Sequence, residues 1–196
     1  LIAAPSDQST AAEWGCTGTP ISGADGTAIG TGAQNTIDIL SGCSQSGIAA
    51  DICDNLTLNG FSDWFLPSKD ELNEMYLNIG GGSALGNIGG FLGLGIHNGY
   101  PWENYWSSSE INYTGSYDSW SQDLTNGIQY GAGYDKGLNC NVRAIRYFSS
   151  TIITNSLSVS TSGWNYILVT DSLGCTAMDS VYVIVNIGGC TDPIAG

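Results

Sequence analysis

Few residues of this 196-residue chain could act as a base or a nucleophile at neutral pH. It has one histidine, His97, and six cysteines, none of which forms a C-x-x-C pair. A Ser–His–Asp or Cys–His site would have to use His97, which lies in a glycine-rich stretch without a nucleophile motif. No GxSxG, HExxH, Walker or GxGxxG pattern occurs. We therefore expect no enzymatic activity and no organic cofactor.

The charge of the chain restricts its partners. Eighteen acidic and four basic residues give a net charge of −14. So few cations cannot displace counterions from phosphates or hold the chain on anionic lipid heads. No apolar run approaches the ~20 residues of a membrane span. We expect neither a nucleic-acid partner nor direct membrane insertion.

Carboxylates in turns could bind calcium, which prefers oxygen ligands. Asp25, Asp118 and Asp123 are the candidates, although no EF-hand string is present. Calcium therefore stays an alternative, and the sequence assigns no metal site.

The cysteine count indicates disulfides. An even number of cysteines in a chain rich in Ser, Thr, Gly and Asn is typical of extracellular proteins; buried free thiols are the alternative. We expect a disulfide between Cys16 and Cys43, which would close a segment with few apolar residues. We expect a second between Cys53 and Cys140, which would join the second helix to the last strand. Cys175 and Cys190 could pair within the tail or outside it.

Three helices are expected in the first 80 residues of the chain. Ser68 and Glu71 form a capping box after Pro67, and the apolar stripe that follows predicts a helix over 68–79. Apolar residues at four-residue spacing over 48–56 predict a second, shorter helix.

An earlier helix is expected to begin at Asn35, a good N-cap residue. Ile37 and Leu40 would then lie on its buried face.

From 102 onward the pattern is typical of strands. Thr125-Asn126-Gly127 predicts a hairpin turn, and 141–148 a last continuous strand. Arg143 and Arg146 on that strand are expected to be buried and paired with carboxylates. The tryptophans expected in the core are Trp64, Trp106 and Trp120.

Composition changes near residue 149, which predicts one domain over 1–148. In residues 149–187 apolar and polar residues alternate, which predicts a small β segment. This segment is too short to fold easily on its own. Residues 188–196 read as a linker or the start of a further repeat, so we expect the chain to have flanking domains.

Three motifs, "DWFLPS", "WSSS" and "VRAIR", occur in this order within 1–148. The region resembles the Lcl C-terminal domain family of bacterial surface proteins. The resemblance implies an α+β fold that is C-type-lectin-like and formylglycine-generating-enzyme-like, with a small twisted antiparallel sheet, two or three helices and long loops. Some members bind glycosaminoglycans, but a domain at −14 should repel sulfated polyanions.

The tail carries a second resemblance. "GWNYILVTDSLGCTAMDSVYVIV" is similar to the closing half of the gliding-adhesin repeat of secreted Bacteroidota proteins, and "GCTDP" to a short repeat of type IX secretion cargo. These similarities imply an extracellular, cell-surface location. They also make Ser172 and Ser180 candidates for O-glycosylation in Asp-Ser-apolar sequons, with Ser172 favoured because it lies in a turn.

The loops expected at 80–104, 110–118 and 130–139 mix aromatic side chains with amides and carboxylates. Such a mixture can stack on sugar rings and hydrogen-bond their hydroxyls; partial burial under the loops is the alternative. The candidate ligand-binding residues are His97, Asn98, Trp102, Tyr113, Tyr117, Tyr130, Tyr134 and Asp135. We expect an adhesin-type module that binds neutral glycan or a surface protein. The alternative is a structural, self-associating module of a cell-surface fibre.

Overall fold

The computed structural model describes residues 1–92, 96–97, 100–101, 104–111, 118–131 and 135–148, and two strands of the tail; for 96–97, 100–101 and these two strands it describes the backbone alone. The chain divides into two compact units, Leu1–Ser149 and Ser150–Gly196, which we describe separately. None of the helices in the described residues is long and apolar enough to span a membrane.

Three helices are present in the first unit. They are α1 (Gly32–Gly42), α2 (Ala49–Asp54) and α3 (Lys69–Ile79). The capping box of α3 is confirmed, because Glu71 N donates to Ser68 Oγ (3.3 Å) and Ser68 N donates to Glu71 Oε2 (2.8 Å). The local pattern therefore located α3 to within a residue at its start.

The prediction for α1 was wrong at its beginning. Thr31 is the N-cap, and Asn35 lies inside the helix, where its Nδ2 donates to Gly26 O (2.6 Å) and Ser108 Oγ (3.2 Å). Ile39 is fully buried, whereas Ile37 is 53% exposed. Asn35 is thus buried inside the helix and bonded to Ser108 rather than serving as a cap.

The main sheet has five strands in the order β2-β8-β5-β6-β7. Their bounds are β2 Ser9–Ala12, β5 Tyr105–Glu110, β6 Ser119–Gln122, β7 Gln129–Tyr130 and β8 Cys140–Val142. β5 and β8 pair in parallel, and the other neighbours are antiparallel. The hairpin turn expected at 125–127 joins β6 to β7, which confirms that prediction. The unit is α+β with a mixed sheet.

The strand expected over 141–148 is interrupted. β9 (Ile145–Arg146) leaves the main sheet and pairs with β1 (Ile2–Ala3), while Ile145 also bridges to Phe65. The break falls where Ala144 N donates to the Gln8 side chain (2.6 Å) instead of a neighbouring strand. A further hairpin joins β3 (Ile96–His97) to β4 (Tyr100–Pro101).

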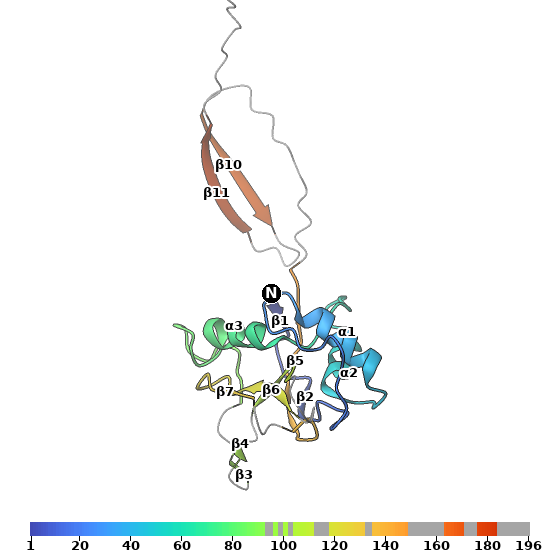
Figure 1. The fold of residues 1–196 in the computed structure, drawn as a ribbon. Helices are drawn as coiled ribbons and strands as arrows, with labels where there is room; N and C mark the ends of the chain where they lie inside the picture. Colours follow the sequence, from blue (N-terminus) through green and yellow to red (C-terminus); the bar gives the residue numbers. More distant parts are fainter. Residues whose placement is uncertain are drawn as a thin grey trace, which may run out of the picture. The chain divides into compact units, whose positions relative to one another are not determined.

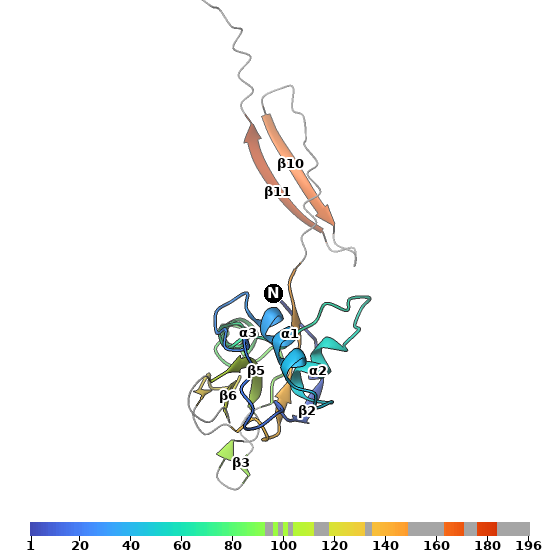
Figure 2. The ribbon, with the colours of Figure 1, turned by 45° about the vertical axis from the view of Figure 1, so that its right-hand side comes forward.

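Apolar side chains gather on both faces of the main sheet. One cluster joins α1 and α2 to Trp106, and the other joins α3 to Tyr105. Because Tyr105 and Trp106 are consecutive on β5, they point to opposite faces. The helices therefore cover the sheet from two sides, α1 and α2 on one and α3 on the other (Figure 1 and Figure 2).

Two of the three tryptophans expected in the core lie there. Trp64 and Trp106 are 5% and 0% exposed, as expected. Trp120 is not fully buried: it lies on β6 and is partly exposed.

One predicted disulfide is confirmed and the other is wrong. Cys16 and Cys43 are bonded, with Cα atoms 5.8 Å apart. Cys53 and Cys140 are free thiols, both buried in the cluster that contains Trp106. Burial is the main cause that raises the pKa of each thiol far above 9.0. They therefore stay protonated and behave as small apolar core residues rather than as bridge partners.

The second unit contains an antiparallel hairpin of β10 (Gly163–Thr170) and β11 (Thr176–Val183). Its register runs from Gly163↔Val183 to Thr170↔Thr176, which leaves residues 171–175 between the strands, where the sequence predicts a turn. Ser180 lies on β11; Ser172 is outside the described residues, and so is the segment 188–196.

Candidate functional site

Two of the three expected loops start from one end of the main sheet. At the end of β5, Ile111 N donates to Asp118 O (3.1 Å), and Asp118 forms a bridge with Asp135. Gly131 lies at the same place, since a Cβ atom on it would be 3.1 Å from Ile111 Cδ1. The segments 112–117 and 132–134 therefore leave from neighbouring points.

The third loop meets β5 at its other end. Leu92 N donates to the Tyr105 hydroxyl (3.0 Å), and Asn104 O accepts from Asn141 N (2.8 Å). The six residues of β5 separate these points by about 20 Å at ~3.3 Å per residue. The three expected loops thus do not all start from the same end of β5.

Most of the candidate aromatics fall outside the part of the chain that the structure describes. His97 is described only through its backbone, in β3. The candidates outside the described residues are Asn98, Trp102, Tyr113, Tyr117 and Tyr134.

The two candidates that the structure describes, Tyr130 and Asp135, lie at the base of the loops. Tyr130 is half-buried and packs on the cluster around Trp106, and burial, followed by the nearby Asp123 carboxylate, raises its pKa. Asp135 Oδ1 accepts from Thr17 Oγ1 (3.0 Å) and Gly137 N (2.7 Å). Both side chains thus brace the loop base.

A buried ion pair fixes this base. Lys136 is 0% exposed; its Nζ donates to Thr19 O (2.8 Å) and to Glu110 Oε1, and lies 4.6 Å from the centre of the Trp14 ring. Glu110 Oε2 in turn accepts from Ile21 N (2.8 Å). The pair ties the end of β5 to the segment that holds Cys16, so the loops start from a rigid support.

The three calcium candidates do not form one site. Asp123 closes the β6–β7 turn, because Oδ1 accepts from Thr125 N and Oγ1 (2.8 and 2.6 Å) and Oδ2 accepts from Asn126 Nδ2 (2.7 Å). Asp118 lies at the bridge to Asp135, and Asp25 is exposed near α1. Among the residues described, no group of three or more His, Cys, Asp or Glu side chains is arranged to hold a metal.

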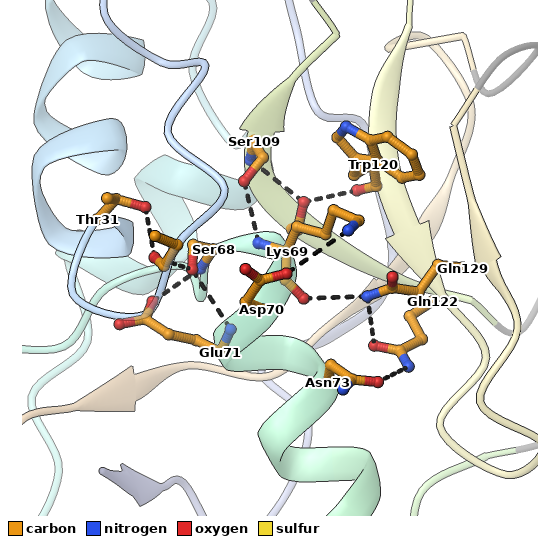
Figure 3. A network of polar contacts seen from close by, with 12 residues as sticks. Thr31, Ser68, Lys69, Asp70, Glu71, Asn73, Ser109, Trp120, Gln122 and Gln129 are labelled. Carbon is orange, nitrogen blue, oxygen red and sulfur yellow. Dashed lines mark hydrogen bonds and ion pairs between the residues drawn. The ribbon is translucent and has the colours of Figure 1, made fainter.

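A polar network lies beside the loop ends, between the start of α3 and β6–β7 (Figure 3). Gln122 Nε2 donates to Asn73 Oδ1 (2.9 Å), and Gln129 Nε2 donates to Lys69 O (3.2 Å) and Gln122 Oε1 (3.4 Å). The Lys69 ammonium lies 4.8 Å from the centre of the Trp120 ring. This network holds a partly exposed indole and a cation side by side on the surface.

Lys69 is distinctive because the other basic side chains are buried. Arg143 pairs with Asp7 (2.6 Å), and Arg146 donates to both oxygens of Asp63 (2.7 and 2.9 Å), which confirms the expected ion pairs. Their side chains are 3% and 7% exposed, that of Lys136 is 0%, and that of Lys69 is 25%. Since the chain has four basic residues, Lys69 is its most accessible cationic side chain.

Comparison with models of known protein families gives no match, and no curated protein sequence matches the chain significantly. The family resemblances therefore rest on the sequence motifs alone.

Sequence reasoning did not assign Trp120 and Lys69 to a surface site. Trp120 was expected in the core together with Trp106, and strand alternation does not reveal which face of a sheet a helix leaves partly uncovered. A usable signal was present for Lys69: a cation at the first position of a helix is unfavourable next to the positive end of the helix dipole.

Proposed function

We propose that the first unit is a non-enzymatic, adhesin-type binding module of a secreted surface protein. Its ligand would be a neutral glycan or a surface protein, held by the aromatic and amide residues of the loops. The observation that carries the proposal is the common origin of segments 112–117 and 132–134 on a base braced by the Lys136–Glu110 pair. Binding residues are commonly presented on loops by such rigid scaffolds.

The finer fold belongs to the same proposal: a C-type-lectin-like domain of the Lcl C-terminal type. Its motif residues hold the unit together, which supports this assignment. Trp64 and Trp106 are buried, and the "VRAIR" arginines bind Asp7 and Asp63. A cell-surface location is supported by the Cys16–Cys43 disulfide, because such bonds persist in oxidising compartments.

For the second unit we propose the closing part of a gliding-adhesin repeat from a type IX secretion cargo of Bacteroidota, with O-glycosylation at Ser172 in preference to Ser180. Intact-mass analysis of native material tests the modification. A mass without added hexose would reject it.

A glycan array with the purified chain tests the binding function. Tyr134→Ala and Trp102→Ala should weaken attachment to the glycans that bind while leaving the melting temperature near that of the wild type. Trp64→Ala should lower the melting temperature instead. If the loop variants unfold like Trp64→Ala and the remaining folded protein attaches normally, the loop aromatics are packing residues and the proposal fails.

A second candidate function is a structural module of a fibre. A cavity of about 510 Å³ opens between α3 and β1, and Ile29 on its wall is 59% exposed. Its other apolar lining residues are Leu1, Ala3, Met75, Ile79 and Ile145. Exposed apolar surfaces of this kind often form contacts between subunits. Concentration-dependent association in sedimentation experiments that is abolished by Ile29→Asp would favour this function; a monomer at all concentrations would reject it.

A further inference from the structure

We infer that Trp120 and Lys69 form a sugar-binding subsite for a neutral pyranose. This surface, which we call the Trp120 platform, consists of Trp120, Lys69, Asp70, Asn73 and Gln129. The inference rests on the proposed binding function and deepens it, because it places contacts for the ligand on the sheet beside the loops.

The ring of Trp120 is held in place by its surroundings. A Cβ atom on Gly131 would lie 3.0 Å from ring atoms Cζ3 and Cη2, so the ring packs on the backbone just after β7, at a residue without a side chain. Lys69 Nζ, which comes from α3, lies over the ring at 4.8 Å from its centre. A fixed, partly exposed indole is a suitable surface for the C–H face of a sugar, since little side-chain entropy is lost on binding.

Polar groups next to the ring are arranged for hydroxyls. Gln129 donates from Nε2 to Lys69 O and Gln122 Oε1. Its Oε1 is therefore the atom that can accept a hydrogen bond from a ligand hydroxyl. Asn73 accepts from Gln122 through Oδ1, so its Nδ2 can donate. Together with the Lys69 ammonium and the Asp70 carboxylate, which is 46% exposed, the platform offers both donors and acceptors, as sugar hydroxyls require.

The same geometry argues against an anionic ligand. The first backbone N–H groups of α3 are already used. Lys69 N donates to Ser109 Oγ (3.0 Å) and Glu71 N to Ser68 Oγ (3.3 Å) (Figure 3), and Asp70 N donates to Thr27 O (3.0 Å). The helix therefore has no amide to offer an anion. Lys69 is itself balanced by Asp70 at 3.5 Å, in a chain of net charge −14.

The test uses the full chain labelled with ¹⁵N. The probes are neutral tetrasaccharides of glucose, mannose, galactose and N-acetylglucosamine, and tetragalacturonate as the charged counterpart. The indole N–H signal of Trp120, assigned with Trp120→Phe, should move on titration with at least one neutral probe and not with tetragalacturonate. Trp120→Ala should weaken binding of that probe at least tenfold and Lys69→Gln about threefold, whereas Phe148→Ala, which removes a 69% exposed aromatic, should change it less than twofold.

Gly131→Ala provides a second variant should Trp120→Ala fold poorly, because its new methyl group displaces the ring without removing it. It should weaken binding while the melting temperature changes little. A neutral probe that binds the wild type without moving the Trp120 signal, or that binds Gly131→Ala equally well, overturns the platform and leaves the loop proposal standing. Preference for tetragalacturonate overturns the assigned ligand class. If no tetrasaccharide binds the wild type, both the platform and the glycan-binding function fail.

Discussion

Lys136 and Lys69 lie in similar chemical surroundings at two places in the first unit. Each ammonium lies over a tryptophan ring, at 4.6 Å from Trp14 and 4.8 Å from Trp120. Each also pairs with a carboxylate, Glu110 or Asp70. They differ in exposure, since the Lys136 side chain is 0% exposed and that of Lys69 is 25%.

That difference assigns them different roles. Removing one partner of a buried pair leaves an uncompensated charge and costs ~3–5 kcal/mol. An exposed pair contributes about 0–1 kcal/mol, and an exposed cation–π contact ~0.5–1 kcal/mol. The buried group stabilises the base of the loops, whereas the exposed one can change partners at little cost, which is what a binding surface needs.

The largest effect is expected at the buried group. Lys136→Met should lower the free energy of unfolding by ~3–5 kcal/mol because Glu110 remains buried without its cation. Urea denaturation measures this. Adding Glu110→Leu to the same chain should restore part of the loss. A single variant that stays within ~1 kcal/mol of the wild type would remove the contrast with Lys69.

A similar contrast is expected between neighbouring tryptophans. Trp106 is fully buried and donates from Nε1 to Ala12 O (2.8 Å), so Trp106→Ala should cost ~3–5 kcal/mol, as large core truncations do. Trp64→Ala should fall in the same range. Trp120→Ala should cost clearly less, because its ring is already partly in water. Equal losses at 106 and 120 would place Trp120 in the core.

The next largest loss of stability is expected when the Cys16–Cys43 disulfide is removed. The Cys16–Cys43 bond closes a loop with a sequence separation of 27, and its removal in a Cys16→Ser/Cys43→Ser variant should cost roughly 3–4 kcal/mol in the chain-entropy model. Mass mapping without reduction should find these two peptides linked, with Cys53 and Cys140 alkylated only after unfolding. Free Cys16 in the native protein would contradict this.

Local signals in the sequence were sufficient for some elements and not for others. The capping box and apolar stripe of α3 act within one helix, so its bounds could be predicted. Asn35 has the same local appearance as a cap, but its partner Ser108 is 73 residues away, and no local pattern contains that contact.

The candidate site shows the same limit. Glycine and aromatic content predicted loops that carry binding residues, but the end of β5 from which each loop starts depends on strand order. The bridge between Asp118 and Asp135 is a long-range contact, and it brings segment 132–134 to the same end of β5 as segment 112–117. The parity of the cysteine count likewise could not distinguish the real bridge from two buried thiols.

A smaller effect on the free energy of unfolding is expected from the Arg146–Asp63 ion pair, which is partly exposed. The two hydrogen bonds from Arg146 hold the pKa of Asp63 below 3.8, although Asp63 is 55% exposed. Because the folded-state pKa is lowered, the stabilisation is complete above the unfolded value and is lost as the pH falls through the folded value. Asp63→Asn should therefore destabilise the chain at pH 6 by about 1 kcal/mol or less and by less still at pH 2. An Asp63 carboxyl that titrates at or above 3.8 by NMR would contradict this.

The smallest effect on stability is expected for Lys69→Met. The substitution loses the Asp70 pair and the contact with Trp120, each worth ~1 kcal/mol or less. It also removes a cation from the positive end of α3, which returns about 0.3–1 kcal/mol. The free energy of unfolding should thus change by less than ~1 kcal/mol, measured by urea denaturation beside Lys136→Met. The indole signal of Trp120 should nevertheless shift, because the ring loses its neighbour. A loss as large as that of Lys136→Met would show that Lys69 supports the fold, and the Trp120 platform would then have no exchangeable cation with which to bind a sugar.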